Sequence, residues 1–156
     1  MLFRSEVWDR LNLIPSEITK RQIIVWRRPK GHNFNKGYFV PSYEWIFLLA
    51  KKDYKLQKGQ SGYGDVWEIS PARNDHDAPF PIDIPLRAIS ASANCEVVFD
   101  PFMGSGTTAL AANALGKKWL GAELTQRWVE YSYERVSKDT DSIRRNLQDY
   151  LQYYIA

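Results

Sequence analysis

A chain of 156 residues with 44% hydrophobic and 14% aromatic residues has enough apolar material for one domain with a real core. No apolar stretch approaches the roughly 20 residues of a membrane span, and Glu6 and Asp9 stand where a signal peptide would be basic and then apolar. The single cysteine, Cys95, excludes an intrachain disulfide and has no metal-ligand spacing around it, so we expect a small core residue. These features predict a cytoplasmic protein without a metal or a membrane partner.

The net charge of +3 is modest, but basic residues crowd the first third of the chain among aromatic ones. Such interleaving suits phosphate contact and base stacking. A solvated basic rim over an ordinary aromatic core explains the pattern equally well. The candidate DNA contacts are Arg27, Arg28, Lys30, His32 and Lys36.

The first half of the chain is expected to form one helix and a pair of strands. Apolar residues at helical spacing predict an amphipathic helix over residues 2–13. Two apolar runs, Gln22–Trp26 and Tyr43–Ala50, predict strands that can pair antiparallel across a polar loop. Residues 53–80 are rich in turn residues, and only Val66–Ile69 has strand character there.

The second half alternates strands and helices, which is typical of an α/β fold. In chain order we expect a helix at 85–91, a buried strand at 96–100, a helix at 107–115 stopped by Gly116, a strand at 119–123, a helix at 126–136 and a last amphipathic helix marked by Ile143, Leu147, Tyr150, Leu151 and Tyr154.

The turn "DPFMGSGTT", residues 100–108, joins the expected strand at 96–100 to a helix. Gly104 and Gly106 allow backbone angles closed to other residues and let a ligand approach the main chain. The helix start directs its amide groups at that ligand, which favours a carboxylate or a phosphate. Glu123 follows at about the 20-residue spacing at which an acidic side chain accepts hydrogen bonds from a ribose. No lysine follows Gly106, which argues against a nucleoside triphosphate, and a purely structural glycine turn is the alternative.

This turn resembles the S-adenosylmethionine-binding motif of the amino-methylating DNA methyltransferases, which modify adenine at N6 or cytosine at N4. The stretches "HDAPFPIDIPLRAI" and "KKWLGAEL" are similar to the neighbouring cofactor motifs, and "QIIVWRRPKG" and "YEWIFLLAKK" to later strands of that family. The resemblance covers roughly residues 20–137, in a circularly permuted order. It implies a Rossmann-like fold and a DNA-modifying enzyme of a prokaryotic or phage restriction-modification system.

The resemblance also implies how the cofactor would be held. Its methionine carboxylate would lie on the backbone around the turn, with Asp100 helping to place the amino-acid end. Phe102 would pack along the cofactor, Glu123 would take the ribose hydroxyls and Leu124 would lie against the adenine. The residues implied for the carboxylate are Gly104, Ser105, Gly106, Thr107 and Thr108, and those implied to close the site from the other side are Phe80 and Pro81.

The family's catalytic motif, an Asp, Asn or Ser followed by Pro-Pro and an aromatic residue, has no counterpart, because no Pro-Pro dipeptide occurs in the sequence. No catalytic residue is therefore assigned to this chain. In the family, the strand that carries this motif lies next to the cofactor strand. On its other side lie the strands to which Gln22–Trp26 and Tyr43–Ala50 are similar. Its absence predicts an incomplete sheet with uncovered apolar edges.

We therefore expect one partial methyltransferase domain over residues 1–156, the C-terminal part of a split or truncated enzyme that acts on DNA with a complementary chain or as a homo-oligomer. Its expected parts are a DNA-facing part at 1–52, a loop-rich connection at 53–79, a cofactor-binding part at 80–137 and a C-terminal helix at 138–156. The alternatives are an inactive remnant that still binds cofactor or DNA, and a methyltransferase for RNA or a small molecule.

Overall fold

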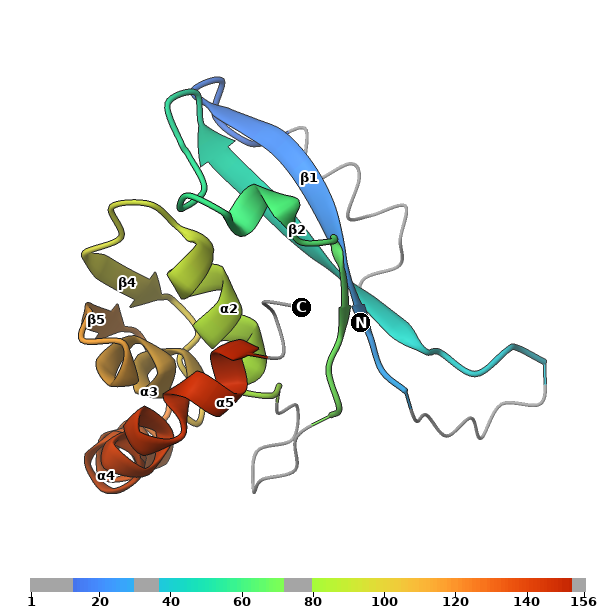
Figure 1. Ribbon diagram of the computed structural model, residues 1–156. Helices are drawn as coiled ribbons and strands as arrows, with labels where there is room; N and C mark the ends of the chain where they lie inside the picture. Colours follow the sequence, from blue (N-terminus) through green and yellow to red (C-terminus); the bar gives the residue numbers. More distant parts are fainter. Residues whose placement is uncertain (1–12, 30–36, 72–79, 153–156) are drawn as a thin grey trace.

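The computed structural model describes residues 13–29, 37–71 and 80–152, drawn in colour in Figure 1. The expected helix over residues 2–13 lies outside this range except for Leu13, which is in a turn. Lys30, His32 and Lys36 also lie outside the described residues.

A three-stranded sheet forms the first half of the described chain. Strands β1 (Ile18–Arg27) and β2 (Tyr43–Lys51) pair antiparallel, which confirms the expected pairing, with an irregularity in register between Lys20 and Gln22. The short strand β3 (Val66–Glu68) pairs parallel with β1, so the order is β2-β1-β3. Strand β2 therefore lies at one edge of this sheet.

Within the described residues, a second sheet consists of β4 (Val97–Asp100) and β5 (Lys118–Gly121), which are parallel. Helix α3 (Thr107–Ala114) connects them and ends near Gly116, whose φ of +69° is the left-handed conformation of a helix stop. This is the strand-turn-helix-strand unit expected from the sequence.

The β4–β5 sheet is covered on one face only. Val98 and Trp119, which are partners in the ladder, pack against the helices. Val97, Phe99 and Leu120 alternate with them and are 52%, 62% and 62% exposed. The expectation of a buried strand at 96–100 was therefore wrong, because the described chain places helices on a single face of these two strands. No ladder joins the two sheets within the described residues, in agreement with a missing central strand.

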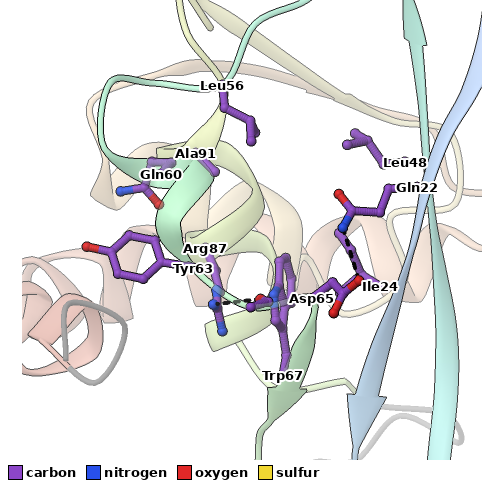
Figure 2. A pocket seen from close by; sticks show the side chains of 11 residues that line it. Gln22, Ile24, Leu48, Leu56, Gln60, Tyr63, Asp65, Trp67, Arg87 and Ala91 are labelled. Atoms are coloured by element: carbon purple, nitrogen blue, oxygen red, sulfur yellow. Dashed lines mark hydrogen bonds between the residues drawn. The ribbon is translucent and has the colours of Figure 1, made fainter.

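Helix α2 (Asp83–Ala91) connects the two halves of the core, and Figure 1 shows it between the two sheets. Its Ile84 packs on the aromatic cluster beside β1, whereas Leu86 and Ile89 pack on α3. Figure 2 shows Arg87 of the same helix beside a small hollow next to β1, with its guanidinium 4.5 Å from the ring centroid of Trp67. The buried face of α2 therefore holds both sheets in one body.

The last helices differ in extent from the sequence prediction. Helix α4 runs over Gln126–Arg145 without a break, and the short α5 (Leu147–Gln152) follows after Asn146. The expected end near residue 136 and the separate helix over 138–156 were wrong. Neither glycine nor proline occurs between residues 126 and 145, so nothing in the backbone chemistry stops α4 earlier.

Candidate functional site

The glycine turn lies at the carboxyl end of β4, where it enters α3. Gly104 and Gly106 have φ of +50° and +77°, and Gly106 is the N-cap residue of α3. A Cβ atom on Gly106 would lie 2.8 Å from Cβ of Ser132 on α4. The second glycine is thus required both by its φ and by the close approach of α4 to the turn.

Glu123 ties the turn to the segment that follows β5. Its Oε2 accepts a hydrogen bond of 2.9 Å from the Gly104 amide, and its Oε1 accepts one of 3.0 Å from the Thr125 amide. A carboxylate oxygen accepts hydrogen bonds, and these two backbone donors fix the orientation of the group. The geometry presents an oriented negative charge beside the glycine turn.

Asp100 shapes the first half of the turn. Its Oδ1 accepts a hydrogen bond of 2.9 Å from the Phe102 amide, and its carbonyl accepts one of 2.9 Å from the Ala122 amide. The Met103 amide in turn donates to the Ala122 carbonyl at 2.9 Å. The loops after β4 and β5 are therefore linked by backbone bonds, at the carboxyl edge where open α/β sheets bind ligands.

The two threonines of the turn have different surroundings. Thr107 is 3% exposed and its Oγ1 lies 3.4 Å from Oγ of Ser105, which is itself 6% exposed. Thr108 is half-buried. The amides of the first turn of α3, by contrast, have no intrahelical acceptor and are available to a ligand by the general property of a helix start. The resemblance implied that both threonines help to hold the carboxylate. In the structure the Thr107 side chain is buried against Ser105, whereas that of Thr108 is only half-buried.

Arg135 of α4, which the sequence patterns did not single out, lies behind the turn. Its Nη1 is 2.9 Å from the Ser105 carbonyl oxygen, 3.1 Å from Ser105 Oγ and 3.0 Å from Thr107 Oγ1. The sequence carries no signal for it, because Arg135 lies about 100° around the helix from Val136 and off the apolar side of the expected helix. Helical periodicity cannot tell an inward arginine from one that extends to solvent.

Two exposed apolar side chains stand next to these polar groups along the chain. Phe102 is 86% exposed and Leu124 is 102% exposed, each directly beside the polar groups of the site. Phe80 is elsewhere, packed on the cluster of Trp26 and Trp67, and Pro81 is buried. The structure thus brings most of the expected cofactor residues together, whereas Phe80 contacts the core beside β1.

Two of the expected DNA contacts, Arg27 and Arg28, lie within the described residues, and both form ion pairs within the chain. Arg27 Nη1 lies 2.6 Å from Glu68 Oε2, and Arg28 Nη1 lies 3.1 Å from Glu44 Oε1. The Arg27 pair is 55% exposed on both sides, and exposed pairs of this kind contribute little stability. Both arginines thus have a carboxylate partner within the chain.

Two kinds of site are absent from the part of the chain that the structure describes. No group of three or more His, Cys, Asp or Glu side chains is arranged to hold a metal ion. No described helix is both long and apolar enough to span a membrane.

Comparison with known proteins identifies the family. Residues 11–134 match the model of the N6/N4 methyltransferases, described as DNA methylase. The chain belongs to this DNA methylase family. Similar proteins include the type II methyltransferases M.BglII of Bacillus subtilis, 29% identical over 94% of this chain and 49% of the relative, and M2.MboI of Moraxella bovis, 27% identical over 86% of this chain and 56% of the relative. The chain thus spans about half the length of these relatives.

Solved structures agree on the fold of this family member. The crystal structure of the M1.HpyAVI–SAM complex matches with a TM-score of 0.70 and 24% identity over 84% of this chain and 68% of the other. The cytosine-N4-specific PvuII DNA methyltransferase matches with a TM-score of 0.63 and 19% identity over 80% of this chain and 57% of the other. The methyltransferase fold expected from the sequence is confirmed by these matches.

Proposed function

We propose that this chain is the cofactor-binding and partly DNA-facing portion of a DNA methyltransferase that transfers a methyl group from S-adenosylmethionine to the exocyclic amine of adenine (N6) or cytosine (N4). The observation that carries the proposal is the pair of hydrogen bonds from the Gly104 and Thr125 amides to Glu123. They place an oriented carboxylate beside a helix start, so one site has an acceptor for ribose hydroxyls and donors for a carboxylate.

The methionine end of the cofactor fits the start of α3. Its carboxylate is an anion, and the amides of Thr107 and Thr108 lie at the positive end of the helix. Asp100 lies on the other side of the turn, where its carboxylate can accept hydrogen bonds from the ammonium group. The two charges of the amino-acid end thus have complementary partners.

The adenosine end fits the loop after β5. Ribose hydroxyls are donors, and the Glu123 carboxylate is an acceptor group whose orientation is set by two backbone hydrogen bonds. Leu124 and Phe102 are exposed next to it and would pack against the flat base and the chain of the cofactor. When bound, the cofactor supplies an electrophilic methyl group on a sulfonium sulfur, and these residues hold and orient it.

We further propose that the acceptor amine is presented by a second, complementary chain that carries the missing motif. The base amine is a weak nucleophile that needs hydrogen-bond acceptors and an aromatic platform, and the Pro-Pro motif that would supply them is absent from the sequence. Among the residues that the structure describes, β4 pairs with β5 alone, which agrees with a sheet that needs a further strand beside β4. The same observations support a second candidate, a remnant that binds cofactor or DNA without catalysis.

A calorimetric titration with S-adenosylmethionine tests the cofactor site directly. We expect saturable binding by the wild-type chain and its loss in Gly104→Asp, which puts a side chain and a negative charge where the carboxylate should lie. Thermal unfolding of the variant serves as the control for folding. A properly folded wild-type chain that binds no S-adenosylmethionine would refute the proposed cofactor site.

A complementation assay separates the two candidate functions. The chain is mixed with a separately purified polypeptide that carries Asp-Pro-Pro-Tyr or Ser-Pro-Pro-Tyr, encoded next to it, and transfer of labelled methyl to DNA is measured. We expect transfer only when both chains are present and none with Gly104→Asp. Transfer by this chain alone would overturn the need for a partner, and no transfer despite cofactor binding would favour the remnant.

A further inference from the structure

Arg135 is a charged side chain that the proposed function does not yet use. It lies on α4, its side chain is only 18% exposed, and its Nη1 reaches three oxygen atoms of the glycine turn at 2.9–3.1 Å. This nitrogen carries two hydrogens, so one of them is shared between acceptors. Asp139, one helical turn further on, lies 3.9 Å from Arg135 Nε and holds the guanidinium from its other side.

We propose that Arg135 is a positioning residue for the carboxylate end of the cofactor, acting through Ser105 and Thr107. The inference rests on the proposed S-adenosylmethionine site. Arg135 contacts the turn from the side that faces α4. It would therefore act on the cofactor through these two residues and not by direct contact.

The physical reason lies in the peptide between Ser105 and Gly106. Its carbonyl oxygen accepts from Arg135, whereas the Gly106 amide donates to the Met103 carbonyl at 2.9 Å. Both ends of this peptide are therefore held, and its plane sets the direction in which α3 begins. Hydrogen bonds from a charged donor are stronger than neutral ones, and the positive charge behind the helix start adds to the field that an anion meets there.

Arg144 on the same helix offers a matched comparison. It also reaches back to α3, but it donates to the carbonyl of Asn113 at 3.0 Å, at the far end of that helix. Both arginines thus connect α4 to α3, and only Arg135 contacts the turn. A role limited to helix packing would change the affinities for different ligands of the site alike, whereas a positioning role would not.

The test measures the affinities of Arg135→Met and Arg144→Met for two ligands by calorimetry. S-adenosylmethionine carries the carboxylate, and 5′-methylthioadenosine has the same adenosine but no amino-acid end. For Arg135→Met we expect S-adenosylmethionine binding to weaken about tenfold or more, the size of one lost charge-assisted hydrogen bond, with methylthioadenosine binding changed less than about twofold. For Arg144→Met we expect no change in the ratio of the two affinities.

Thr107→Val removes one acceptor of Arg135 with little change of volume. If Arg135→Met does not fold, the ratio of the two ligand affinities is measured with this variant. We expect a shift of the ratio in the same direction. Equal weakening of both ligands, or an unchanged ratio in a folded variant, would overturn the positioning role. Absence of S-adenosylmethionine binding in the wild-type chain would instead refute the proposed site on which the inference rests.

Discussion

The close approach of α4 to the glycine turn makes Gly106→Ala a sharp test of the structure. The new Cβ would lie 2.8 Å from Ser132 Cβ and 3.2 Å from Ser132 Cα, and Ser132 is fully buried in α4. An alanine would also have to keep a φ of +77°. Neither the buried helix nor the turn can move away without breaking other contacts.

Two costs therefore add. The left-handed conformation costs a residue with a Cβ about 1–2 kcal/mol, and forced overpacking of a buried site costs about 1–3 kcal/mol. We expect Gly106→Ala to lower the free energy of unfolding by about 2–5 kcal/mol, read from urea denaturation monitored by circular dichroism. At about 2–4 °C for each kcal/mol in a domain of this size, the melting temperature would fall by about 4–20 °C.

Gly116→Ala is the matched control, because Gly116 has a similar φ of +69° and nothing within 4 Å of the position of a Cβ. It carries the conformational cost alone, so we expect a loss of about 1–2 kcal/mol. If the two variants lost the same free energy of unfolding, the close contact between α4 and the turn at Gly106 would be refuted. Gly106→Ala combined with Ser132→Gly should recover part of the loss, since it removes the nearest clashing atom.

Three further variants test other parts of the structure. Glu123→Gln should weaken S-adenosylmethionine binding and lower stability by about 1–3 kcal/mol, seen in titration and urea denaturation, because an amide cannot accept both backbone N–H groups. Asn113→Ala should cost about 1 kcal/mol in the same denaturation assay, since it loses a 2.9 Å hydrogen bond to Thr140. Burial raises the pKa of the Tyr150 hydroxyl above its usual 10.0, so the folded state keeps this proton to a higher pH than the unfolded state does. The free energy of unfolding should therefore fall as pH rises past about 10, and Tyr150→Phe should lack this contribution.

The strands and helices could be read from the sequence because each follows from a local pattern. β-branched and aromatic runs predicted β1 and β2, and the glycine turn predicted the start of α3. The boundaries of α4 were missed because polar residues after Val136 weaken the apolar period without breaking the helix. The exposure of Phe99 was missed because an apolar strand reads the same whether or not its second face is covered.

The sequence by itself determined the family and the cofactor turn. The glycines at 104 and 106, the positive φ angles that they allow and the spacing to Glu123 belong to a short segment and could be read from it. The missing Pro-Pro motif was likewise visible in the sequence alone.

Only the tertiary structure decided what surrounds that turn. Arg135 and Thr107 are 28 positions apart, and no local pattern announces that one donates to the other. The same holds for Glu123, whose spacing indicated a ligand contact but whose two backbone bonds depend on the parallel pairing of β4 and β5. Side-chain contacts across elements depend on the distance and orientation of packed helices and strands, and these emerge only when the whole chain has folded.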